Sequence, residues 1–158
     1  MKRSMSRKHS KSVDRAADII AADCLAVRVR LLNRTITAIY DDALRPLGLT
    51  AGQLNVLVII AKRGPIAPSE IARRLNMEKS TVSRNLARMR DNGWITVTAG
   101  ESGRKQRLTL NARGKALLER SLPVWEEAQT QTRAVLGQRG ADSIRSIGNT
   151  VWSRIGRD

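Results

Sequence analysis

The sequence predicts a mainly α-helical fold with one small β-hairpin. Apolar residues recur at spacings of three, four and seven over most of the 158 residues, which is the pattern of amphipathic helices. A short predicted helix, 69–75, precedes a longer one, 78–92, after a tight turn. Two runs of strand-forming residues, 94–98 and 106–110, then flank a polar, basic tip. This order is that of a winged helix-turn-helix, and long helices are predicted on both sides of it.

The composition narrows the classes of function. Hydrophobic residues make up 41% of the chain, enough for a packed core. No apolar run reaches the ~18 residues of a membrane span. The basic residues also lack an apolar partner face outside the dimerisation elements, so no membrane partner is expected. With one cysteine and one histidine, we expect no internal disulfide, metal site, cofactor or enzymatic activity. The net charge of +15 points to a polyanionic partner, nucleic acid first and an anionic membrane surface second.

Residues 1–12 carry five basic residues, no acid and almost nothing apolar. This composition predicts a disordered basic arm. The arm lacks the apolar core of a secretory signal, so we expect a cytoplasmic protein.

Residues 13–46 are predicted to form an N-terminal dimerisation helix that ends at Pro46. Two adjacent apolar stripes run along it. They consist of Leu25, Leu32, Ile36, Ile39 and Ala43, and of Cys24, Val27, Leu31 and Ala38. One stripe is enough to pack on a single core, so two indicate a helix that also meets a second chain.

Residues 47–111 hold the predicted winged helix-turn-helix domain. Thr50 is the expected N-cap of its first helix. Pro68 opens the short helix, and Gly93 ends the longer one at a position suited to left-handed backbone. Asn111 is the expected N-cap of the helix that follows the hairpin.

Residues 112–158 are predicted to form C-terminal dimerisation helices. The first runs to about residue 136, with a kink at Pro123, and glycines at 137 and 140 break the chain. The last helix carries one apolar face, made of Ile144, Ile147, Val151 and Ile155.

The longer helix of the helix-turn-helix is amphipathic in a way that indicates a reading function. Its core side holds Val82, Leu86 and Met89. The opposite side is expected to hold Ser80, Thr81, Arg84, Ala87 and Arg88, with no acidic residue. Arginine can bond guanine in a bidentate manner, and hydroxyls can bond base edges or phosphates. Residues 62–107 carry 11 basic and 4 acidic residues, so we expect double-stranded DNA as the partner.

The other candidate DNA-binding residues surround this helix face. We expect Arg104, at the hairpin tip, to enter a minor groove, with Lys105 and Arg107 near phosphates. The residues expected to position the DNA backbone are Thr50, Ser69, Lys79 and Arg73 or Arg74, and Ser83 is a further DNA-binding candidate.

The sequence resembles the MarR family of winged-helix transcriptional regulators over about residues 20–137. The matching stretches are 47–53 (LGLTAGQ), 69–75 (SEIARRL), 80–89 (STVSRNLARM), 92–95 (NGWI), and Gly103-Arg104 ahead of 110–114 (LNARG). The resemblance implies a homodimer with interlocking terminal helices, whose recognition helices enter successive major grooves of a pseudo-palindromic operator. It also implies wings in the flanking minor grooves and control by a small-molecule effector or an oxidant. We expect a repressor.

Three positions depart from the family pattern. Ser102 stands where the family typically has Asp, two residues before Arg104, which puts the orientation of that arginine in doubt. Asn111 replaces a usual Thr, and Asn caps a helix at least as well. The chain has no Phe, so an aromatic-lined ligand pocket is thinly furnished.

Two residues are candidates for a ligand or redox role. The family includes peroxide sensors with one reactive cysteine near the start of the first long helix, the region of Cys24. Inert packing is the alternative, because a buried cysteine in an apolar stripe behaves as a small hydrophobe. Tyr40 shares a helix face with Ile36 and Ala43, and its hydroxyl is a candidate ligand contact.

A sequence-nonspecific architectural protein that coats DNA or RNA is the alternative function. The basic arm and the net charge favour it. The face that combines hydroxyls with arginines argues against it, because coating a polyanion requires no such face.

Overall fold

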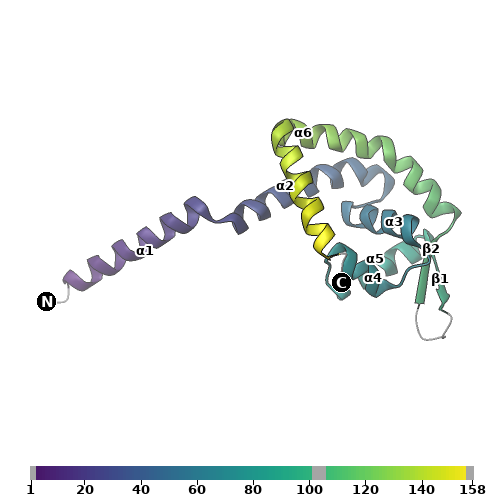
Figure 1. The fold of residues 1–158 in the computed structure, drawn as a ribbon, viewed down its shortest axis with the longest axis horizontal. Helices are drawn as coiled ribbons and strands as arrows, with labels where there is room; N and C mark the ends of the chain where they lie inside the picture. The colour runs from purple at the N-terminus through teal and green to yellow at the C-terminus, as the bar shows by residue number, and fades with distance from the viewer. Residues whose placement is uncertain (1–2, 101–105, 156–158) are drawn as a thin grey trace. The chain divides into compact units, whose positions relative to one another are not determined.

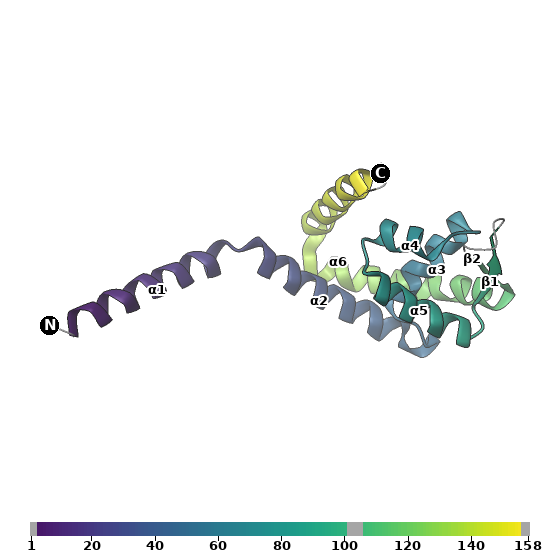
Figure 2. The ribbon, with the colours of Figure 1, turned by 90° about the horizontal axis from the view of Figure 1, so that it is seen from below.

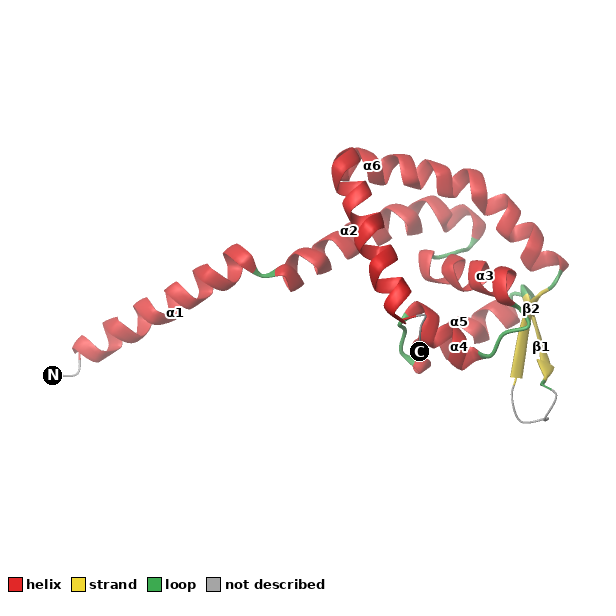
Figure 3. Ribbon diagram, viewed as in Figure 1, coloured by secondary structure: helices red, strands yellow, loops and turns green. Residues whose placement is uncertain are grey.

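The computed structural model describes residues 3–100 and 106–155, with side chains from residue 11 onward. The elements in chain order are α1 (Arg3–Asp23), α2 (Leu25–Leu44), the 3-10 helix η1 (Arg45–Leu47), α3 (Ala51–Arg63), α4 (Pro68–Leu75), α5 (Lys79–Asp91), β1 (Ile95–Ala99), β2 (Gln106–Leu110) and α6 (Ala112–Ile155) (Figure 1). The predicted class, mainly α with a hairpin wing, is confirmed (Figure 3). The chain divides into two compact units, residues 1–36 and 37–158, so the boundary predicted at residue 46 falls within the second.

The N-terminal unit differs from the sequence prediction in two ways. Residues 3–12 are helical and continue into α1, where we predicted a disordered arm. The stretch has neither glycine nor proline, and its Met, Lys and Arg residues favour helix. The helix predicted as continuous is also interrupted at Cys24. There the Arg28 guanidinium donates to the carbonyl oxygen of Cys24 and to that of Ala22 in the last turn of α1. The second bond satisfies an acceptor freed at the end of the helix.

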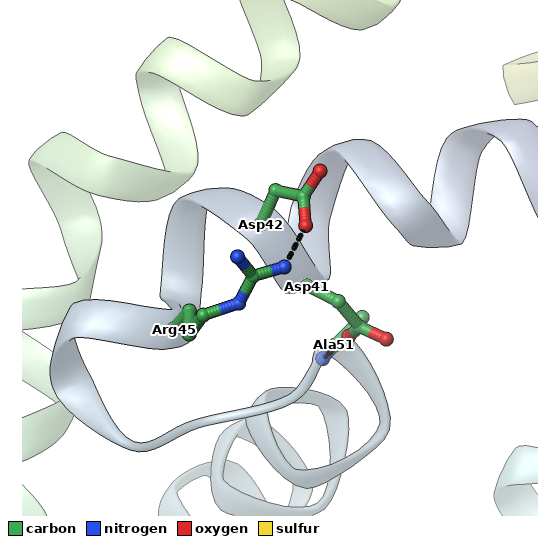
Figure 4. A network of polar contacts seen from close by, with 4 residues as sticks. All are labelled: Asp41, Asp42, Arg45 and Ala51. Atoms are coloured by element: carbon green, nitrogen blue, oxygen red, sulfur yellow. Dashed lines mark hydrogen bonds and ion pairs between the residues drawn. The ribbon is translucent and has the colours of Figure 1, made fainter.

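Within the second unit, a tight connection joins α2 to α3. Thr50 is the N-cap of α3 as predicted: its hydroxyl accepts from the Gln53 amide at 3.3 Å, and the Gln53 side chain accepts from the Thr50 amide at 3.1 Å. This is a capping box. The Asp41 carboxylate of α2 accepts from the Ala51 amide at 2.7 Å, beside an Asp42–Arg45 ion pair (Figure 4). Polar contacts at both ends of the turn therefore fix where α3 starts.

The hydrophobic core of the second unit lies among α3, α4, α5 and the hairpin. Its fully buried side chains include Leu44, Leu57, Ile60, Ile66, Ile71, Val82, Met89 and Leu108. Pro68 opens α4 as predicted, and Asn76 ends it in the left-handed conformation with φ 48°. That residue makes the turn between α4 and α5, and Asn tolerates this backbone better than most residues.

The two strands form the predicted antiparallel hairpin, with Ile95 opposite Leu110 and Ala99 opposite Gln106. Ile66 adds a bridge to Leu108 on the other edge of β2. Figures 1 and 2 show the hairpin at one end of the second unit, adjoining α5. The tip, residues 101–105, lies outside the described residues.

Helix α6 continues through Pro123, where we predicted a kink. Its backbone leaves helical geometry at Gly137, with φ 68° and ψ 163°. A positive φ favours glycine, so the predicted break at this residue is confirmed. Figure 1 shows the resulting change of direction before the yellow C-terminal part of α6. Among the described residues, no single helix is long and apolar enough to cross a membrane. Leu25–Leu47 and Ala51–Arg63 reach that length and apolar character only when taken together, and a 75° bend separates them.

Candidate nucleic-acid interface

Helix α5 is anchored by one face and leaves the other to solvent. Val82, Leu86 and Met89 are 1%, 8% and 0% exposed, so the predicted core side is confirmed. The exposed residues of the opposite side and its flank are Lys79, Ser80, Ser83, Arg84, Arg88, Arg90 and Asp91; Thr81 and Ala87 are half-buried. The helix thus presents hydroxyl and guanidinium groups outward from a rigid base.

Arg84 is held by its own helix. Its guanidinium donates to the Thr81 hydroxyl, one turn earlier, at 3.3 Å. This contact directs the arginine toward the N-terminal half of α5 and reduces the rotamer freedom that a DNA contact would otherwise have to remove.

One acidic residue does lie on this side, contrary to our expectation. Asp91 is the last residue of α5 and is exposed. It accepts from Arg90 at 3.5 Å. Eleven residues separate it from Ser80, which is ~16 Å along a helix. The N-terminal two turns of the face are therefore free of negative charge.

A hollow of about 500 Å³ lies between α5, the start of α4 and the hairpin. Five polar side chains contribute to its lining: Ser69, Lys79, Ser83, Arg90 and Gln106. None of the described residues that line it is acidic. It therefore offers cations and hydrogen-bond donors in a concave surface beside the exposed face of α5.

Arg90 and Gln106 are absent from the residues predicted from the sequence. The signal for Arg90 was present, because Ser83 and Arg90 are seven residues apart and share one side of a helix. The side they share is the one that the hairpin faces. That relationship depends on the tertiary packing of β1 against α5, so residue spacing alone did not identify it.

The other predicted contacts differ in availability. Arg73 is exposed, whereas Arg74 donates to Glu70 at 3.0 Å in a half-buried ion pair that offsets its charge. Arg107 is half-buried in β2, and its carbonyl accepts from Thr98. Arg104 and Lys105, like Ser102, lie outside the described residues.

The two candidate ligand or redox residues lie in different units. Cys24 is half-buried at the break between α1 and α2. Tyr40 is half-buried and packs against the core of the second unit. Burial raises the pKa of Tyr40, and the Thr132 hydroxyl and the Arg133 guanidinium oppose that effect.

The comparisons with known proteins agree with this geometry. A profile of the MarR family matches residues 47–106. The chain is 35% identical over 77 residues to the uncharacterized HTH-type transcriptional regulator YwoH of Bacillus subtilis, covering 49% of this chain and 56% of that protein. It is 32% identical over 95 residues to the HTH-type transcriptional repressor Mb2911 of Mycobacterium bovis, covering 60% of this chain and 68% of the relative. The chain thus spans little more than half the length of YwoH.

Solved structures extend the likeness beyond the central domain. The transcriptional regulator MosR of Mycobacterium tuberculosis, crystallised in complex with DNA, superimposes with a TM-score of 0.69 at 34% identity. The superposition covers 83% of this chain and 98% of MosR. This chain has the MosR fold, matches the family profile over residues 47–106, and is 32% identical to a relative of which it covers 68%. It is therefore a member of the MarR family of transcriptional regulators.

Proposed function

We propose that this chain is a sequence-specific, double-stranded DNA-binding repressor that reads a pseudo-palindromic operator as a homodimer. The observation that carries the proposal is the exposed side of α5, where serine, threonine and arginine side chains stand opposite the buried Val82, Leu86 and Met89. A helix of this kind fits a major groove. The relative MosR, crystallised with DNA, supports the choice of partner. The relative named a repressor supports the direction of control.

The residues divide into two groups by their place on the surface. Ser80, Arg84 and Arg88 are exposed on the side opposite the core, with the half-buried Thr81 beside them. All four are assigned to base edges. The group assigned to phosphates lies on α3, α4, the α5–hairpin hollow and the wing: Thr50, Ser69, Arg73, Arg74, Lys79, Ser83, Arg90, Arg104, Lys105 and Arg107. Within that group, Arg74 is expected to contribute least because Glu70 already pairs with it.

The homodimer is supported by apolar side chains that one chain leaves in water. Val13, Ile20 and Leu25 are 61%, 63% and 74% exposed, and Ile147 near the other end is 64% exposed. Exposed apolar residues repeated along one helix side, such as Ile144, Ile147 and Val151, are typical of interaction surfaces. Burying such residues stabilises by about 25 cal/mol per Å². Both terminal regions are therefore assigned to the interface between two chains.

A small-molecule effector is part of the proposal. A pocket of about 560 Å³ lies between α3 and α6, a volume within the ~300–1,000 Å³ typical of small-molecule sites. Val58, Leu122, Trp125 and Trp152 line it with other residues. An apolar ligand there would contact both the DNA-binding domain and the C-terminal helix, whose relative position sets the spacing of the two recognition helices.

Selection of bound duplexes from a randomised pool, at two salt concentrations, tests the proposal. A sequence-specific dimer enriches a pseudo-palindrome with half-sites about one helical turn apart. Arg84→Ala should abolish or relax the enrichment, whereas Arg139→Ala, an exposed arginine on α6, should leave it intact. Tight binding with no enriched sequence would instead establish the sequence-nonspecific architectural protein, which the net charge of +15 favours.

A further inference from the structure

A side chain of α2 forms a hydrogen bond with the first turn of α3. The half-buried Asp41 carboxylate accepts from the Ala51 amide at 2.7 Å, and Figure 4 shows both residues at the corner between the two helices. Ala51 is the first residue of α3, so its amide has no carbonyl partner within that helix. A carboxylate suits this position, because it accepts the free N–H and opposes the positive end of the helix dipole.

This bond differs from the other side-chain bonds at the start of α3. Thr50 and Gln53 bond each other within the capping box, and those bonds would persist if α3 moved away from α2. Asp41, by contrast, ties the amide of Ala51 to a separate helix. The bond therefore restrains the position of one helix relative to the other.

The rest of the attachment between α2 and the second unit is limited. The connection turns at Gly48, whose φ of 67° is left-handed, and Leu44 and Leu49 on either side are 0% and 2% exposed. Tyr40 also packs against the core. Among the residues that the structure describes, α2 makes few close backbone approaches to other elements. The orientation of residues 37–44 within the unit therefore depends on this corner, and Asp41 supplies its polar bond.

Helix α3 in turn carries the exposed side of α5. Leu57 of α3 shares one buried cluster with Val82 of α5. A Cβ atom at Gly52, in the first turn of α3, would lie 3.9 Å from the side-chain nitrogen of Asn85, the residue after Arg84. Because close-packed side chains interdigitate, α3 and α5 should move as one body. The Asp41 bond thus connects α2 to the helix that presents Arg84.

We propose that Asp41 is a positioning residue, which fixes the angle between α2 and the α3–α5 pair and thereby sets the spacing of the two half-sites. The inference rests on the proposed homodimeric reading of DNA, in which α2 belongs to the interface between two chains. With α2 held there, the corner decides where each α5 lies. One base pair is ~3.4 Å of translation and about one tenth of a turn, so a small change at the corner moves α5 out of register.

Binding to a series of operators tests this role. The series carries the half-site that the wild type enriches, at the best spacing and at spacings one base pair shorter and longer. Asp41→Ala should reduce the preference for the best spacing by about five-fold. Asp42→Ala is the matched control, because Asp42 is the next residue of α2, is exposed and pairs with Arg45. It should keep the wild-type preference, and an equal reduction in this control would overturn the proposal.

A duplex with a single half-site separates positioning from reading and from folding. Asp41→Ala should bind it as tightly as the wild type, because the exposed side of α5 is unchanged. A loss of folded protein would instead weaken the single half-site and every spacing alike, and that result would overturn the proposal. Thermal unfolding of each variant gives the folded fraction.

Hydrogen exchange of the Ala51 amide, measured without DNA, reports the bond itself. Exchange should be faster by about ten-fold in Asp41→Ala and unchanged in Asp42→Ala. Asp41→Asn keeps an oxygen that can accept from the amide, so it should retain both slow exchange and the spacing preference. Unchanged exchange in Asp41→Ala would overturn the restraint. A relaxed spacing preference in Asp41→Asn with slow exchange would show that the bond does not set the spacing.

Failure of this inference and failure of the proposed function give different results. If the duplex selection enriches no pseudo-palindrome, the proposed function fails, and the spacing role of Asp41 fails with it. If a pseudo-palindrome is enriched but Asp41→Ala keeps the wild-type spacing preference, the proposed function stands and only the role of Asp41 is overturned.

Discussion

Gly114 in the first turn of α6 lies directly against the carbonyl of Trp94, such that a Cβ atom at Gly114 would be 2.0 Å from that oxygen. The contact joins the end of α5 and the start of β1 to α6. Both partners are backbone or close to it, so neither can move without shifting a whole element.

Gly114→Ala should therefore destabilise the fold. Overpacking a well-packed site typically costs 1–3 kcal/mol, and we expect about 2 kcal/mol or more because the obstructing atom is backbone. Gly52→Ala, in α3, is the matched control: its Cβ would meet only the Asn85 side-chain nitrogen, at 3.9 Å, and alanine is favoured over glycine in a helix by up to about 1 kcal/mol. Urea unfolding measures both. Equal stabilities for Gly114→Ala and the wild type would contradict the close packing.

The stability of the chain should also depend on the ionisation of Tyr40. Burial raises its folded-state pKa above the ordinary value of 10.0, so the folded state retains the proton to higher pH than the unfolded chain. The resulting stability is fully present below pH 10.0 and is lost as pH rises through the folded pKa. Above pH 10.0 the wild type should therefore lose free energy of unfolding relative to Tyr40→Phe, which has no hydroxyl to ionise.

Tyr40 is the one tyrosine of the chain, so tyrosinate absorbance reports its titration directly. A midpoint above 10.0 in the folded protein is expected. A midpoint at or below the value in denaturant would show that the Thr132 hydroxyl and the Arg133 charge outweigh burial, and the predicted pH dependence would then reverse.

Arg90 should contribute to DNA affinity without contributing to sequence preference. It lines the hollow between α5 and the hairpin, and its pairing with Asp91 is long and exposed, so breaking that pair costs little. Arg90→Ala should weaken selected and random duplexes by the same factor and lower the slope of log K against log salt by about 1. A loss confined to the selected duplex would instead identify Arg90 as a base-reading residue.

Features set by local chemistry could be predicted from the sequence. The Thr50 cap, the buried side of α5 and the break at Gly137 each depend on residues within a few positions of one another. The helix over residues 3–12 was not predicted, because the high charge of this stretch indicated disorder while the helix propensity of its residues favoured α-helix. The end of α5 near Gly93 was predicted correctly, but Asp91, nine residues after Val82 and so on the opposite side of the helix, was overlooked.

Relations between distant elements could not be predicted. The hollow containing Arg90 and Gln106 requires β2 to lie beside α5, and Trp94 meets Arg113 and Arg120 only after α6 docks on the turn that follows α5. Sequence spacing records which residues share a helix side, but not which element covers it. The candidate reading side was therefore identified, and the concave surfaces beside it were not.

Arg84 on α5 is proposed to read bases, and the ratio of affinities for the selected operator and a scrambled duplex tests this role most directly. At physiological salt the wild type should favour the operator by ~10³-fold or more. Arg84→Ala should lose about 1–3 kcal/mol on the operator with little change on the scrambled duplex, while Arg139→Ala preserves the ratio. Equal weakening on both duplexes would make Arg84 a phosphate contact and contradict the claim.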